Sequence, residues 1–87
     1  MPLPILNSAE DVCAALREAI TAALPDAQVQ VTASSPGHFE IDVVSTAFAG
    51  LSMVRQQQLV YGAIKELMAG DGAPVHAVDR LKTRTPS

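Results

Sequence analysis

Two histidines carry the side chains best suited to chemistry in this sequence of 87 residues, and a single cysteine accompanies them. Imidazole is a common ligand of transition metals. However, His38 and His76 are too few to close a tetrahedral metal site, which takes four ligands. Any metal site built on this pair must therefore be completed by ligands from a partner.

Each of these three side chains also has a simpler interpretation. His38 lies at the start of an alternation of polar and apolar residues and belongs to its polar side. It can be either a solvated hairpin residue or a metal ligand. A lone histidine such as His76, at the start of a strand, is usually a surface or capping residue. Cys13 borders an apolar helical stripe, which favours a small half-buried side chain over a reactive thiol. A single cysteine forms no internal disulfide and no CxxC pair, which is typical of a reducing compartment.

The composition indicates one small domain with an aliphatic core, since 48% of the residues are hydrophobic and only 3% aromatic. A net charge of −3 argues against binding nucleic acid mainly by phosphate neutralisation. Residues 1–7 lack the basic and apolar regions of a signal peptide. No apolar run reaches the roughly 18 residues that cross a bilayer. We therefore expect a soluble cytoplasmic protein with no membrane association.

The first half of the chain predicts a helix followed by a hairpin. Residues 1–7 are expected to be a loose lead-in, and residues 8–87 the folded domain. Ser8 is a good N-cap, and Pro25 ends the helix that it begins. Alternation predicts strands at residues 27–33 and 38–45, joined by the turn-forming residues 34–37.

The second half predicts a short helical turn near Gly50, a helix at residues 53–69 and a last strand. Met53 and Met68 are expected to join Val60, Ile64 and Leu67 in the core. The last strand is expected to begin at Val75, with His76 as its second residue. Its alternation then fails, because Val78 and Leu81 are three residues apart, so either these two side chains face opposite sides of the sheet or a bulge intervenes near Asp79.

These elements predict an α+β fold in which helices cover one face of a three-stranded mixed sheet. A helix separates the second and last strands, so these strands can be parallel neighbours but cannot form a hairpin. His38 and His76 can share a ligand only if these two strands begin at the same end of the sheet.

Several short motifs, in their order and spacing, resemble the BolA-like family over roughly residues 8–86. The matching pieces are HFEIDVVS at residues 38–45, the F-x-G at 48–50, the R-x-x-x-x-V-Y at 55–61, His-Ala-Val at 76–78 and Thr-Pro at 85–86. The QQ-x-VYG run at 57–62 is similar to the IbaG (YrbA) subgroup. The segment from His76 to Pro86 is one residue longer than usual in the family, in agreement with a bulge.

The resemblance implies an α-β-β-α-α-β order similar to a type II KH domain. It also implies a monothiol glutaredoxin partner and a [2Fe–2S] cluster shared with that partner and glutathione, with none bound when the chain is alone. His76 matches the family's ligand position, and His38 is the second candidate. The function implied is iron–sulfur cluster trafficking or iron and redox sensing, by a monomer or weak homodimer. The alternative is a DNA-binding transcriptional regulator, as described for some members.

Two groups of residues are candidates for partner binding. Arg55, Gln58 and Tyr61 are spaced three apart, so they lie on one helix face and can form a docking surface. Arg80 and Lys82 can contact phosphates or an acidic partner, although charges on an edge strand also discourage aggregation. The sequence contains no pattern of an enzyme active site, and residues 50–53 lack the GxxG of a KH loop.

Overall fold

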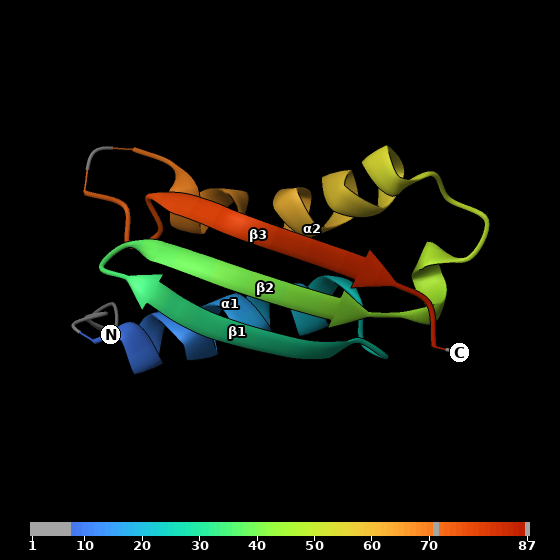
Figure 1. The fold of residues 1–87 in the computed structure, drawn as a ribbon, viewed down its shortest axis with the longest axis horizontal. Helices are drawn as coiled ribbons and strands as arrows, with labels where there is room; N and C mark the ends of the chain where they lie inside the picture. The colour runs from blue at the N-terminus through green and yellow to red at the C-terminus, as the bar shows by residue number, and fades with distance from the viewer. Residues whose placement is uncertain (1–7, 71, 87) are drawn as a thin grey trace.

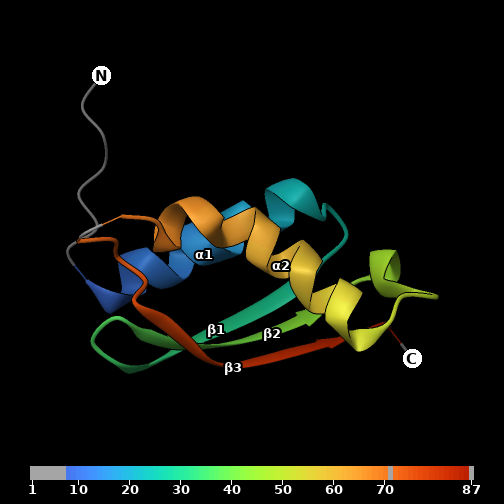
Figure 2. The same ribbon diagram turned by 90° about the horizontal axis from the view of Figure 1, so that it is seen from above.

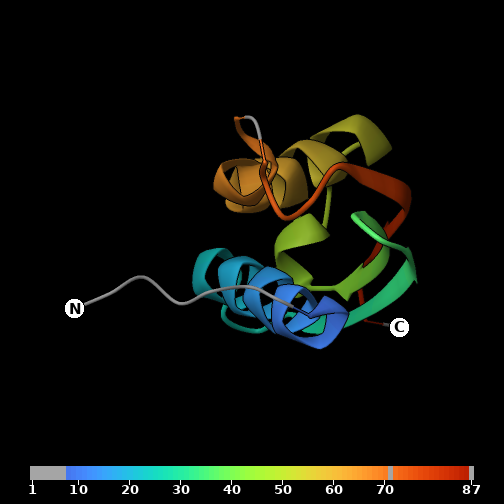
Figure 3. The same cartoon turned by 90° about the vertical axis from the view of Figure 1, so that its left-hand side faces the viewer.

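The chain folds into a three-stranded sheet with two helices on one of its faces (Figures 1 and 2). The computed structural model describes residues 8–70 and 72–86, so the expected lead-in at residues 1–7 lies outside the described residues. Viewed from one end, both helices lie on the same side of the sheet (Figure 3). This confirms the predicted α+β class. The elements are α1 (Ala9–Ala23), β1 (Gln28–Ser35), β2 (His38–Val44), the 3-10 helix η1 (Thr46–Phe48), α2 (Met53–Met68) and β3 (Ala77–Arg84).

Helix α1 begins and ends where the sequence predicts. The Ser8 hydroxyl accepts a hydrogen bond from the Asp11 amide at 3.1 Å, satisfying one of the free amides of the first turn. The helix ends just before Pro25, which cannot continue it. Its buried side chains form one stripe that faces the sheet: Val12, Leu16 and Ile20.

Strand β2 is the centre of the sheet, antiparallel to β1 and parallel to β3. Its alternation is complete, because every second side chain is buried against the helices. The parallel pairing is possible because η1 and α2 carry the chain back to the other end of the sheet. The mixed sheet predicted from the order of elements is therefore confirmed. The buried residues of β2 are Phe39, Ile41 and Val43.

The last strand begins later than predicted, at Ala77 rather than Val75. Val75 is buried, and its amide donates to the carbonyl of Leu67 at 3.1 Å. The chain is therefore tied to the end of α2 at this point, and the ladder with β2 starts two residues further on. His76 precedes the strand instead of being its second residue.

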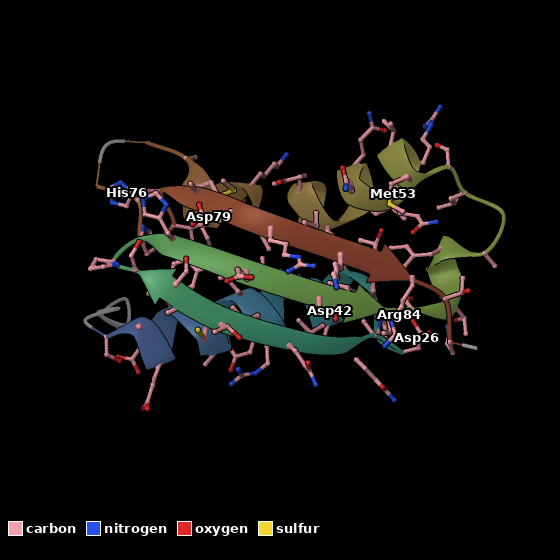
Figure 4. The ribbon with its side chains drawn as sticks, viewed as in Figure 1. Asp26, Asp42, Met53, His76, Asp79 and Arg84 are labelled. Carbon is pink, nitrogen blue, oxygen red and sulfur yellow. The ribbon has the colours of Figure 1, made fainter. Side chains whose placement is uncertain are left out.

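Helix α2 is capped by Ser52, whose hydroxyl accepts from the Arg55 amide at 3.3 Å. Val60 and Ile64 are fully buried, as predicted. The prediction that Met53 is in the core is wrong, since its side chain is 55% exposed. Met53 is the first residue of the helix (Figure 4), and its sulfur lies 3.4 Å from the Thr83 hydroxyl, which donates to Gln56 Oε1 at 2.8 Å.

The short helical turn expected before α2 is η1, which turns the chain at the end of β2. Asp26 holds this turn through both carboxylate oxygens. One accepts from the Ser45 hydroxyl at 2.7 Å, and the other accepts from the amide and hydroxyl of Thr46, each at 2.7 Å. These hydrogen bonds, the one from Ser45 first, lower the pKa of Asp26 from 3.8 to about 2.

Replacing Asp26 with asparagine is expected to reduce stability near neutral pH and to have little effect near pH 2. The folded-state pKa of Asp26 lies below its ordinary value, so its contribution is present above about pH 4 and is lost as the pH falls toward about 2. Urea unfolding of both proteins across this range measures the difference. Glu18→Gln, on the exposed side of α1, is the control. A constant difference between wild type and Asp26→Asn at all pH values contradicts this account.

Candidate metal and partner-binding site

The parallel pairing of β2 and β3 brings the two histidines to the same end of the sheet. His38, the first residue of β2, pairs with Ala77, the residue directly after His76. The structural requirement for a shared ligand, that both strands begin at one end, is therefore met. Figure 4 shows His76 at this end, away from Asp26 and Arg84 at the other.

His76 is held by its backbone and exposes its side chain. Its amide donates to the carbonyl of Gly37 at 2.8 Å, and the amide of Ala77 donates to the same oxygen at 3.1 Å. The imidazole lies against Gly37, so a Cβ atom at that position would overlap the ring. Gly37 also has a φ of 78°, a conformation that L residues rarely adopt. A glycine in the hairpin turn is therefore required for the imidazole to occupy its observed position.

Replacing Gly37 with alanine is expected to displace the His76 ring and to destabilise the fold by about 1–2 kcal/mol from backbone strain alone. Urea unfolding measures the free energy, and the NMR signals of the His76 ring report its displacement. Gly62→Ala is the matched control, because Gly62 lies inside α2 with open space around the new Cβ. It is expected to stabilise the protein by up to about 1 kcal/mol. Unchanged His76 signals in Gly37→Ala would show that the contact does not restrict the ring.

His38 lies in a hydrogen-bonded group that the sequence analysis did not predict. Its Nδ1 is 3.0 Å from an oxygen of Asp79, with the two side chains 43% and 44% exposed. The Ser34 hydroxyl donates to the other Asp79 oxygen at 3.1 Å. The hydrogen bond with His38 is the largest cause of a lowered pKa at Asp79, followed by the one from Ser34. In the sequence, only the suspected bulge near Asp79 distinguished this residue from other acidic residues.

The five residues predicted to bind a partner lie on two separate surfaces. Arg55, Gln58 and Tyr61 are exposed on α2, as expected. Arg80 and Lys82 belong to the sheet face opposite the helices, where they line a shallow groove of about 190 Å³ with acidic residues of β2. The fold therefore does not bring the two groups together into one docking surface.

The sequence model of a family described as BolA-like protein matches residues 20–87. The chain belongs to the BolA-like family. BolA-like protein 1 of Bos taurus is 42% identical over 57 residues, which are 66% of this chain and 39% of that protein. The acid stress protein IbaG of Escherichia coli K12 is 40% identical over 50 residues, or 58% of this chain and 56% of that protein. The chain thus matches less than two thirds of the length of either relative.

Solved BolA structures share this fold. The solution structure of BolA1 from Mus musculus superposes with a TM-score of 0.70 at 31% identity, covering 99% of this chain and 76% of that one. A BolA protein homologue from Coxiella burnetii gives a TM-score of 0.69 at 28% identity, covering 91% of each chain. These comparisons confirm the family resemblance and the fold. Assignment to the IbaG subgroup stays a prediction, since BolA-like protein 1 has a similar identity.

The donor groups of this BolA-like chain suit a metal centre shared with a partner. Within residues 8–70 and 72–86, no three histidine, cysteine or acidic side chains form a group that could hold a metal ion. Cys13 is half-buried on α1, packed against the core, as expected for a structural thiol. A metal ion held through His38 and His76 would therefore need external ligands.

No helix in the described part of the chain is long and apolar enough to cross a membrane. The cytoplasmic location expected from the sequence stays a prediction.

Proposed function

We propose that this BolA-like chain is an interaction module that binds a monothiol glutaredoxin and supplies imidazole ligands to a [2Fe–2S] cluster shared with it. The observation that carries the proposal is the register of β2 and β3, which places His38 beside the residue that follows His76. The chain acts in iron–sulfur cluster trafficking or in iron and redox sensing. It performs no catalysis of its own.

The chemistry of the two imidazoles supports a cluster to which this chain supplies nitrogen ligands and the partner supplies sulfur ligands. The Nδ1 of His38 is engaged by Asp79, so its Nε2 is the nitrogen available to a metal, and the His76 ring is exposed. Glutaredoxin and glutathione thiolates supply the sulfur ligands. Imidazole in place of thiolate raises the reduction potential of such a cluster.

Mixing the protein with cluster-loaded monothiol glutaredoxin tests the proposal. We expect a heterodimer by size-exclusion chromatography and a change in visible absorption and circular dichroism, because imidazole replaces a ligand of the cluster. Cluster-free glutaredoxin is the control for binding that does not involve the metal. An unchanged spectrum and the absence of a heterodimer would contradict the proposal.

Binding of duplex DNA has less support from the geometry. Arg80 and Lys82 pair in register with Glu40 and Asp42, which offset their charge on the open sheet face. The net charge of −3 opposes binding to phosphates as well. If the protein binds duplex DNA at low salt and this binding weakens steeply as salt increases, the result would favour a DNA-binding regulator over a glutaredoxin-binding module.

A further inference from the structure

Asp79 reaches His38 because it is an extra residue in β3. Phe39 pairs with Val78, and the next residue, Glu40, pairs with Arg80, so Asp79 has no partner in the ladder. A bulge of this kind redirects a side chain out of the normal alternation. The Asp79 carboxylate is thereby placed within hydrogen-bond distance of the His38 ring.

A second bulge, in β1, supplies the other contact to this carboxylate. Ala33 pairs with Phe39 and Ser35 pairs with His38, which leaves Ser34 as the extra residue. Both strands that flank β2 are therefore irregular at the same level of the sheet. Ser34 binds one carboxylate oxygen of Asp79 and His38 binds the other, at 3.1 and 3.0 Å. A carboxylate held at two points has a fixed orientation toward the imidazole.

This arrangement determines which nitrogen of His38 carries the proton. An ionised carboxylate only accepts hydrogen bonds, so the Nδ1 of His38 has to be the donor. In the neutral ring the lone pair is then on Nε2. Histidines that bind metals commonly have their second nitrogen bound to a carboxylate in this way.

We propose that Asp79 is a positioning residue that holds His38 in the Nδ1–H tautomer and so presents its Nε2 as a metal ligand. The identity of the metal centre rests on the function proposed above. The tautomer itself does not, because the hydrogen bonds that impose it lie within this chain.

The tautomer can be measured on the free protein by long-range ¹H–¹⁵N NMR at about pH 8, where an ordinary imidazole is neutral. We expect His38 to be in the Nδ1–H form in wild type and to shift toward Nε2–H in Asp79→Ala, with the His76 signals unchanged. Asp79→Asn retains an oxygen acceptor and is expected to preserve the tautomer partly. Ser34→Ala removes one of the two contacts and is expected to give an intermediate shift. An Nε2–H tautomer at His38 in wild type overturns the proposal.

The role toward the metal is tested on the complex with cluster-loaded glutaredoxin. Loss of a carboxylate that orients a ligand typically weakens metal binding by about 10–100-fold. Asp79→Ala is expected to lose its cluster to a chelator at least about 10-fold faster than wild type. Adding Asp79→Ala to His38→Ala should not accelerate cluster loss beyond that of His38→Ala alone. Glu18→Gln should lose its cluster at the wild-type rate. If His38→Ala accelerates cluster loss and Asp79→Ala does not, the positioning role is wrong.

The two measurements distinguish this inference from the proposed function. A wild-type chain that forms no cluster-bridged heterodimer contradicts the function, and with it the ligand role of Nε2. The tautomer of His38 in the free protein decides in either case whether Asp79 controls the imidazole.

Discussion

Replacing His76 with alanine is expected to abolish the cluster-bridged complex with glutaredoxin. The imidazole is exposed, and the hydrogen bonds that fix residue 76 come from the backbone, so alanine removes the proposed ligand without disturbing the fold. Loss of a direct ligand should weaken cluster binding more than loss of a residue that only orients a ligand, for which the effect reaches roughly 100-fold. Visible circular dichroism of the mixture, followed during titration, measures the retained cluster.

The stability of the free His76→Ala variant should remain within about 0.5 kcal/mol of wild type, as is usual for exposed positions. His76→Cys is the informative counterpart, because a thiolate also binds iron. We expect it to restore the complex with a lower reduction potential, since thiolate replaces imidazole. A His76→Ala chain that gives the wild-type spectrum would show that the cluster is bound elsewhere.

Replacing Phe48 with alanine is expected to cost about 3–5 kcal/mol of unfolding free energy. Phe48 is 1% exposed and is one of the largest side chains in the core, which also contains residues of α1, α2 and the sheet. A domain of this size has a total stability of about 5–15 kcal/mol, so the loss is a large fraction of it. Urea unfolding followed by circular dichroism measures the change.

Val54→Ala is the control for this core substitution, because Val54 is 63% exposed on the first turn of α2. We expect its effect to stay within about 0.5 kcal/mol. A loss below about 1 kcal/mol in Phe48→Ala would mean that the neighbouring side chains close around the cavity.

The elements of this fold were predictable where local chemistry decides them. Ser8 and Ser52 cap helices because their hydroxyls accept from amides three residues later. The alternation of β2 fixes its buried face, and the helix between β2 and β3 excludes a hairpin and allows a parallel pair. The start of β3 was not predictable, because Val75 is drawn to the end of α2 by a hydrogen bond to Leu67 that depends on tertiary packing.

The site was predicted only in part for a similar reason. The order of elements indicated that His38 and His76 reach one end of the sheet if their two strands are parallel, and the spacing left a bulge near Asp79 as one of two alternatives. The contact between Asp79 and His38 depends in addition on register, which two separate irregularities determine. Ser34 lies in a segment read as a turn, and no local pattern distinguishes its extra position in β1. The separation of Arg80 from α2 likewise depends on which sheet face the helices cover.

The parallel pairing of β2 and β3 also has a consequence for the order of events during folding. The two strands are joined through η1 and α2, so the loop between them has to close before the ladder can form. Contacts between distant parts of a chain form slowly because that closure costs entropy. His38 and His76 therefore reach the same end of the sheet only when the chain has formed its last strand. If the two histidines hold a cluster as proposed, its capture has to wait for the folded state.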